Sequence, residues 1–207
     1  FIVMSCVEPD FHSLLCDKMV FKANLANIHP ILVFTKLDLV SKNHYVYRFI
    51  EDYQQSGYDV VLIKKDGILD DFKTYLKGKI SVLSGNSGVG KSTLLNRLDS
   101  DLELKTQKIS KALGRGKHTT TNTTLFEIGD GYVADTPGFS TLSFENESRL
   151  ELSKAILDFK KYHTCKFNDC LHVSEPQCGI KEAVKNGLIS EIRYNNYLKV
   201  LNEMKED

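Results

Sequence analysis

Residues 85–92 read Gly-Asn-Ser-Gly-Val-Gly-Lys-Ser, a spacing typical of a loop that binds nucleotide phosphates. The glycines let the backbone curl so that successive N–H groups point at phosphate oxygens, and a following helix adds a field that favours an anion. In such a loop Lys91 reaches the terminal phosphates and Ser92 binds magnesium. A glycine turn without a ligand is the alternative, but the spacing and the Lys-Ser pair disfavour it. The predicted nucleotide contacts here are Gly85, Asn86, Ser87, Gly88, Val89, Gly90, Lys91, Ser92 and Thr93.

A second motif, Thr35-Lys36-Leu37-Asp38, follows an apolar run and resembles a segment that reads guanine. A carboxylate at Asp38 can accept two hydrogen bonds from N–H groups on one edge of guanine, a pair of donors that adenine lacks. The stem of Lys36 can cover the base. Thr35 is shorter than the Asn that is commoner at this position, which predicts somewhat looser base selectivity. An ordinary surface loop is the alternative reading of the motif alone.

Two further segments predict the part of the site that senses the third phosphate. Asp135, in Asp-Thr-Pro-Gly, is placed to hold magnesium through water, and the N–H of Gly138 can meet the third phosphate. Within a run of threonines, Thr120 or Thr121 offers a hydroxyl to magnesium. Ras-like enzymes orient the attacking water with Gln just after this glycine, where the chain has Phe139. Unaided hydrolysis should therefore be slow.

The residues between 103 and 127 include no acid, in a chain whose formal net charge is zero. This basic loop suits RNA phosphate. A solvated loop that steadies bound nucleotide is the alternative. His118 is either a catalytic residue that positions water or only a phosphate contact. The basic residues of the loop are Lys105, Lys108, Lys111, Arg115, Lys117 and His118.

Three cysteines and a histidine lie close together near the end of the chain. Their spacing, Cys165-x4-Cys170-x-His172-x5-Cys178, supplies four ligands for tetrahedral zinc with no open position for catalysis. His163 is a competing ligand, and reduced, metal-free cysteines are the alternative. The other two cysteines, at positions 6 and 16, stand in apolar surroundings and are expected to be inert.

Apolar runs at residues 1–7, 31–34, 58–63 and 80–83 alternate with amphipathic or capped segments, which predicts an α/β fold with a parallel sheet covered on both faces. Helices are expected at about 10–27, 41–57, 66–76 and 91–98. A hairpin is expected at 123–128 and 132–135, and helices at about 147–162, 180–186 and 188–205. We expect the nucleotide domain to span residues 1–144 and a small helical zinc domain residues 145–207.

The guanine motif precedes the phosphate loop, the reverse of the order in Ras-like GTPases. Ligands bind at the carboxyl ends of parallel strands whichever strand is synthesised first, so a circularly permuted fold, joined near residues 70–80, can still build one site. Apolar residues make up 42% of the 207, enough for a packed core, and no apolar run approaches the roughly 20 residues of a membrane helix. We expect a cytoplasmic monomer without a membrane partner. The start at Phe1, inside an apolar run, suggests an earlier segment.

These motifs together, with Gly114-Arg115-Gly116-Lys117 before the threonines, resemble the family of ribosome small subunit-dependent GTPase A. The resemblance covers nearly the whole chain. It implies a circularly permuted GTPase with GTP or GDP, Mg²⁺ and one structural Zn²⁺. It further implies stimulation by the small ribosomal subunit and its rRNA, late maturation of that subunit, and an oligonucleotide-binding barrel ahead of this chain.

Two other classes of function stay open on the sequence alone. The first is a GTP-dependent module that binds an RNA particle with little turnover, for which Phe139 is the motivating residue. The second is an ATP-using phosphotransferase built on the same phosphate loop. In the leading interpretation, loss of the third phosphate frees Gly138, and residues 139–144 deliver the movement to the zinc domain. Flexible glycines near residues 145–148 should then uncouple hydrolysis from release of the subunit.

Overall fold

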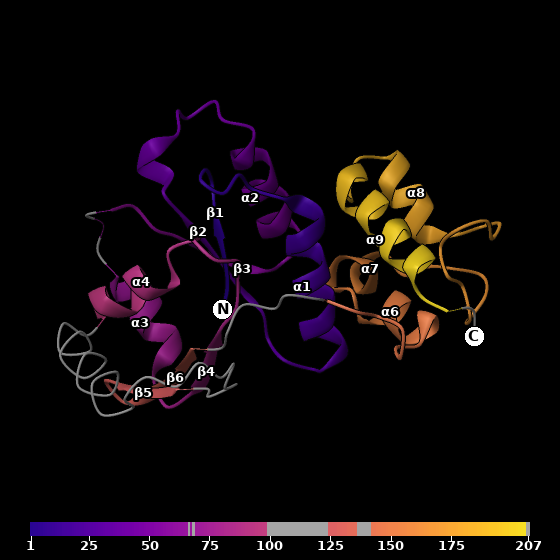
Figure 1. The fold of residues 1–207 in the computed structure, drawn as a ribbon. Coiled ribbons are helices and arrows are strands. Elements are labelled where there is room, and N and C mark those ends of the chain that lie inside the picture. Colours follow the sequence, from indigo (N-terminus) through magenta and orange to yellow (C-terminus); the bar gives the residue numbers. More distant parts are fainter. Residues whose placement is uncertain (66, 68, 99–123, 136–141, 206–207) are drawn as a thin grey trace. The chain divides into compact units, whose positions relative to one another are not determined.

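The computed structural model describes residues 1–65, 67, 69–98, 124–135 and 142–205. It is an α/β protein whose first part alternates strands and helices (Figure 1). None of the helices within these ranges is long and apolar enough to cross a bilayer.

The first three strands form one sheet in the order β1-β2-β3, with bounds Ile2–Ser5, Ile31–Thr35 and Asp59–Leu62. Strands β1 and β2 are buried at every position, as their continuous apolar sequence predicts. Helix α1 (Ser13–Leu25) links β1 to β2, and helix α2 (Val46–Gln55) links β2 to β3. A short 3₁₀ helix, Leu37–Leu39, follows β2 directly and carries the end of the predicted guanine motif.

The second sheet has the order β4-β6-β5, with bounds Ile80–Leu83, Gly131–Asp135 and Thr124–Ile128. Strands β4 and β6 run parallel, and β5 and β6 form the predicted antiparallel hairpin. A parallel bridge between Ile2 and Ser84 joins β1 to the end of β4, with Val3 N donating to Ser84 O at 2.7 Å. Helix α3 (Asp70–Leu76) precedes β4, and helix α4 (Lys91–Leu98) follows the phosphate loop.

The remaining elements are helices: α6 (Arg149–Ala155), α7 (Leu157–Tyr162), α8 (Gly179–Lys185) and α9 (Glu191–Glu203). The prediction of one helix over 147–162 is wrong, because Ile156 has extended backbone angles and divides it into α6 and α7. The side chain of Ile156 is 1% exposed, so burial of this residue accompanies the bend. Ser148 caps α6 by accepting a hydrogen bond from Glu151 N.

Other helix starts also differ from the prediction: α3 begins at Asp70 instead of near 66, and α9 at Glu191 instead of near 188. Helix α1 begins at Ser13 instead of near Asp10, and His12 Nδ1 caps it by accepting from Leu15 N at 3.3 Å. Helix α2 begins at Val46, several residues after the Ser41 that the sequence suggested as its cap. Polar residues that could cap a helix recur along both connections, so composition alone does not select the true start.

The chain divides into two compact units. The first contains Phe1–Asp10, Val33–Val40 and Val61–Ser140, and the second contains Phe11–Leu32, Ser41–Val60 and Thr141–Asp207. Within the second unit, α1 packs against α6 and α9 (Figure 1). The predicted boundary at 144/145 concerns independently folding domains and stays a prediction.

A buried ionic cluster lies inside the second unit. Arg193 of α9 donates through Nε to Asp17 Oδ1 of α1 at 3.1 Å and through Nη1 to Asp158 Oδ2 of α7. Tyr53 OH also donates to Asp17 Oδ1, at 3.0 Å, and Asn196 Nδ2 donates to Asp17 Oδ2 at 2.8 Å. Burial raises the pKa of Asp17, and the charge of Arg193 opposes that shift. The cluster therefore connects α1, α7 and α9 through buried charges. Removing one of these charges would leave its partners buried without compensation.

Candidate functional site

The phosphate loop occupies the place that its sequence predicts, between the end of β4 and the start of α4. Gly88 and Gly90 have positive φ angles of 81° and 99°, which side chains with a Cβ rarely adopt. A Cβ at Gly85 would lie 2.2 Å from the carbonyl oxygen of Val3 in β1. The glycines are thus required by the curl of the loop and by its close approach to the first strand.

The ammonium of Lys91 lies across this loop. Its Nζ donates to Gly85 O at 2.6 Å and to Asn86 O at 2.9 Å. The three N–H donors of the ammonium can bond to phosphate oxygens as well as to carbonyl oxygens. A terminal phosphate would therefore replace these carbonyls as the partner of Lys91. Ser92 and Thr93 follow on the first turn of α4 and are exposed.

The guanine motif is joined to the phosphate loop through Thr35. Its hydroxyl donates to Val89 O at 2.7 Å and lies 3.4 Å from Met4 O, and the residue is 5% exposed. From the sequence alone, Thr35 is expected only to fall short of the base. The structure gives this side chain another task, which is to hold the end of β2 against the phosphate loop.

The remaining residues of the motif lie in the turn that follows β2. Lys36 has a positive φ of 59°, and its Nζ donates to the carbonyl oxygen of Glu8. Leu37 is 3% exposed and anchors the 3₁₀ turn, whereas Asp38 is exposed. Asp38 Oδ1 accepts a hydrogen bond from Lys65 N at 3.0 Å. The carboxylate is therefore held on one oxygen by the main chain, and its further lone pairs can accept other donors.

The predicted switch residues fall largely outside the described ranges. His118, Thr120, Thr121, Gly138 and Phe139 all lie there. Asp135 is described in its backbone only: it ends β6 and is the register partner of Leu83. The phosphate loop begins two residues after Leu83, so the backbone places Asp135 at the same edge of the sheet as that loop. Their predicted roles stay predictions.

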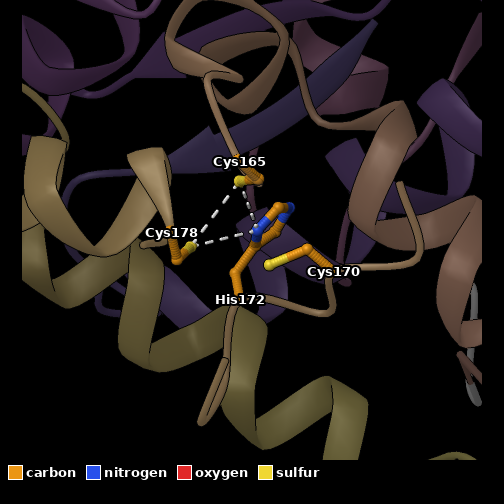
Figure 2. A group of neighbouring side chains, drawn as sticks. All are labelled: Cys165, Cys170, His172 and Cys178. Atoms are coloured by element: carbon orange, nitrogen blue, oxygen red, sulfur yellow. Dashed lines mark hydrogen bonds between the residues drawn. The ribbon is translucent and has the colours of Figure 1, made fainter. Parts of the chain in front are cut away.

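The four predicted zinc ligands do lie together. Their ligand atoms are all within 4.8 Å of one another, in the group Cys165, Cys170, His172 and Cys178. Figure 2 shows the thiols and the imidazole directed at a common point. His163, the competing ligand, is not in this group; its ring centroid lies 5.8 Å from that of His172.

The spacing of the donor atoms matches a tetrahedral zinc ion. Zinc bonds of about 2.3 Å to sulfur and about 2.0 Å to nitrogen set two sulfurs about 3.8 Å apart, and a sulfur and a nitrogen about 3.5 Å apart. The Sγ atoms of Cys165 and Cys178 are 3.8 Å apart. They lie 3.5 and 3.4 Å from Nδ1 of His172. The imidazole would therefore bind through Nδ1.

Burial keeps the ligand groups of the cluster uncharged when no metal is bound. Burial raises the pKa of the Cys178 thiol, and it raises the pKa of Cys170 to about 12. Burial lowers the pKa of His172 to about 4, so the ring is neutral at neutral pH. Buried thiols of this kind become thiolates when a divalent cation binds them. Burial likewise raises the pKa of Cys6 to about 11, but Cys6 is not in the cluster of ligands, which fits the predicted inert role of this fully buried residue.

Glu175 supports the metal-binding loop and was not predicted from the sequence. Its Oε1 accepts from Leu171 N at 2.6 Å and its Oε2 from Val173 N at 2.8 Å, so the carboxylate brackets His172. His172 itself has a positive φ of 62°. Two tyrosines of α9 complete the support: Tyr194 OH donates to His172 O at 2.6 Å, and Tyr197 OH donates to Leu171 O at 2.7 Å. The sequence signal is a carboxylate three residues after a ligand.

Comparison with known proteins agrees with these features. The family model for RsgA GTPase matches residues 1–145. A Geobacillus protein (strain WCH70) called small ribosomal subunit biogenesis GTPase RsgA is 46% identical over 211 residues, covering 99% of this chain and 72% of the relative. A Listeria monocytogenes relative (serotype 4b, strain F2365) is called small ribosomal subunit biogenesis GTPase RsgA 1. It is 43% identical over 209 residues, which cover 99% of this chain and 71% of the relative.

Two solved structures share the fold. YjeQ from Thermotoga maritima is 36% identical, with a TM-score of 0.79 over 98% of this chain and 69% of that one. YloQ, described as a circularly permuted GTPase, is 32% identical, with a TM-score of 0.79 over 98% of this chain and 66% of that one. The chain thus spans 66–72% of the length of these four proteins. The reversed order of its motifs agrees with the description of YloQ, and the chain belongs to the RsgA GTPase family.

Proposed function

We propose that this chain hydrolyses GTP in response to the small ribosomal subunit and acts late in the maturation of that subunit. The observation that carries the proposal is the hydrogen bond from Thr35 to the phosphate loop, which sets the guanine motif and the phosphate motif of an RsgA GTPase side by side. The relatives named for small-subunit biogenesis supply the partner. Work on this particle would place the chain in the cytoplasm.

The chemistry divides among the described residues as follows. Asp38 reads the base, the N–H groups of residues 85–90 and the amine of Lys91 hold the phosphates, and Ser92 binds Mg²⁺ beside them. Catalysis of this kind rests on positioning and on stabilising charge, so a rigid loop suits the task. Asp135 at the end of β6 would support the magnesium through water.

The step that the chain performs poorly alone is the activation of water. Phe139 stands where Ras-like enzymes carry Gln, and its ring offers no hydrogen bond to water. His118, or a group donated by the subunit, would take that role. The basic loop over residues 105–118 would bind rRNA phosphates. A dependence of hydrolysis on the subunit follows from these two features.

The cysteine cluster would hold one structural zinc ion. Three sulfurs and Nδ1 of His172 fill all four tetrahedral positions, so a metal here stabilises the fold without a site for substrate. The fit of the donor distances and the support from Glu175 favour this role over free thiols.

The decisive experiment measures multiple-turnover GTP hydrolysis while isolated small subunits are titrated in. We expect a slow basal rate that rises strongly with subunits, and a weaker rise at about 200 mM salt than at about 50 mM because phosphate contacts are screened. Lys91→Ala should abolish both rates. A rate that is unchanged by subunits would contradict the proposal.

The rival functions give other outcomes in the same assay. A binding module would bind subunits with GTP but show single turnover, which is the alternative that Phe139 favours. An ATP-using enzyme would tolerate Asp38→Asn, because adenine does not need the carboxylate. For the proposed GTPase, the same substitution should shift preference from guanine to xanthine nucleotides, since the amide can donate to the xanthine oxygen.

A further inference from the structure

We propose that Arg97 is a positioning residue for guanine: it holds the turn that Lys64 and Gly67 close, against which Asp38 is set, and so contributes to the choice of guanine over adenine. The inference rests on the proposed role of Asp38 in reading the base. Arg97 lies outside the nucleotide-binding motifs of the sequence, and its contacts with Lys64 and Gly67 assign it this role.

The turn follows β3 and is closed by a hydrogen bond from Gly67 N to Lys64 O of 3.1 Å. Arg97 approaches both ends of it. Nη1 donates to Lys64 O at 2.9 Å, and Nη2 donates to Gly67 O. A planar guanidinium presents two parallel donors at a fixed spacing, so it can hold two carbonyls of one turn in a single orientation.

The turn that Arg97 holds also orients Asp38. Lys65 lies between the two carbonyls that Arg97 binds, and its N–H donates to Asp38 Oδ1 at 3.0 Å. Hydrogen bonds to a carboxylate are stronger than those between neutral groups, so this contact fixes the direction of the side chain. Arg97 therefore acts on Asp38 through Lys65, without touching the base.

The position of Arg97 on α4 adds a geometric reason for this role. Lys91, at the start of the same helix, binds the phosphates in the proposed mechanism. Six residues of helix separate the two Cα atoms by about 9 Å along the axis. One rigid element thus presents a cation to the phosphates and a second cation to the turn beside the base-reading carboxylate. That helix sets the spacing between the two cations.

The test compares dissociation constants for Mg²⁺-GDP and Mg²⁺-ADP in the full chain. For Arg97→Ala we expect GDP to bind about tenfold more weakly, because a contact that orients a charged acceptor is lost. ADP affinity should change less than about twofold, so the GDP-to-ADP preference falls about tenfold. Arg97→Lys should lie between, since an ammonium cannot match the fork of the guanidinium. Lys73→Ala, which removes an exposed cation from α3, should match the parent chain.

Equal losses for GDP and ADP would overturn the proposal, because they would mean that Arg97 only supports the fold. An unchanged preference would overturn it as well. Thermal unfolding is measured for each variant, and if Arg97→Ala does not fold, the preference of Arg97→Lys decides. Asp38→Asn distinguishes failure of the proposed base reading from failure of the proposed role of Arg97. If the Asp38→Asn variant keeps the preference for GDP over ADP, Asp38 does not read the base. If it loses that preference while both Arg97 variants keep it, only the role of Arg97 is wrong.

Discussion

The hydroxyl of Thr35 donates a 2.7 Å hydrogen bond to the main-chain carbonyl of Val89. Thr35 closes the second strand of the chain, and Val89 lies inside the phosphate loop that follows the fourth. Through this contact, the segment proposed to read the base and the segment proposed to hold the phosphates become one site, although their order is reversed. The site depends on where strands end in the sheet, and the bond from Thr35 shows one way in which the ends are fixed.

Replacing Thr35 with Val tests this junction. Valine has nearly the same shape, but it leaves the buried carbonyl of Val89 without its donor. We expect a loss of about 1–2 kcal/mol in the free energy of unfolding and a clear weakening of GDP binding. Urea unfolding and a GDP titration measure the two effects. Thr35→Ser keeps the hydroxyl and is the matched control, so equal behaviour of the Val and Ser variants would show that the hydrogen bond is unimportant.

The strands and the phosphate loop could be predicted because their signals are local. Apolar runs such as residues 31–34 and the glycine spacing of residues 85–92 need no distant partner to be recognised. The permuted order followed from the same motifs, and it agrees with a solved relative described as circularly permuted. The cysteine cluster was predicted from spacing, and the structure brings its four members together.

The features that were missed depend on contacts distant in sequence. Ile156 divides one predicted helix into two at a fully buried position, which no local pattern marks. Arg97 looks like an ordinary charged residue near a helix end until the turn that Lys64 and Gly67 close is placed beside it. Glu175 looks like a surface acid until the backbone folds around His172. Polar side chains that bind main-chain atoms carry little signal in the sequence, because many residues could play the same part.

Glu175 predicts a testable effect on metal affinity. Glu175→Gln replaces one accepting oxygen with an amide NH₂ that faces either Leu171 N or Val173 N, so one of the two hydrogen bonds is lost. Such supporting contacts are worth about 10–100-fold in metal affinity. We therefore expect zinc to be lost at a correspondingly lower concentration of chelator, followed by unfolding of the surrounding helices.

The control for this measurement is Glu182→Gln, which makes the same change at an exposed position of α8. Its zinc affinity should equal that of the parent chain. Cys178→Ser removes a ligand outright and sets the scale for full loss. If Glu175→Gln holds zinc as tightly as Glu182→Gln does, the carboxylate does not support the site.

The buried cluster around Arg193 predicts a pH-dependent loss of stability. Arg193→Met leaves Asp17 and Asp158 without their shared cation, and at pH 7 we expect a loss of about 3–5 kcal/mol in the free energy of unfolding. Burial already raises the pKa of Asp17, and Arg193 opposes that rise. Without the arginine, the pKa of Asp17 should rise further.

The sign of the pH effect follows from that direction. A carboxyl group with a raised pKa binds its proton more tightly in the folded state than in the unfolded state, so its cost to stability grows as the pH rises above the unfolded value of about 3.9. The loss caused by Arg193→Met should therefore be smaller at pH 5 than at pH 7. Urea unfolding at both pH values measures it. The control is Lys199→Met, at an exposed position on the same helix, which should leave the free energy of unfolding nearly unchanged at both pH values. Equal losses for Arg193→Met at pH 5 and pH 7 would show that Asp17 does not cause the pH dependence.

Phe144 is anchored within the second unit of the chain. The ring of Phe144 is 2% exposed, Lys22 Nζ of α1 lies 4.7 Å from its centroid, and the same amine pairs with Glu147 at 2.6 Å. In the hypothesis that residues 139–144 carry a movement along the chain, that movement would meet Phe144 before residues 145–148. Residues 145–148 lie at or beyond it, so the upstream link at Leu142 and Ser143 is the sharper place to interrupt the proposed coupling.

Inserting three glycines between Leu142 and Ser143 should leave subunit-stimulated GTP hydrolysis intact, because the insertion lies outside the nucleotide motifs. Release of the chain from the small subunit after hydrolysis should become slower, because slack in the link absorbs the displacement before it reaches Phe144. Pelleting of subunits after a single round of hydrolysis measures the retained fraction. The same insertion between Asn186 and Gly187, in the exposed turn after α8, controls for added length. Equal release of the two insertion variants and the parent chain would mean that the movement does not pass through residues 142–144. Lys22→Ala, which removes the amine beside Phe144, would then also be released normally.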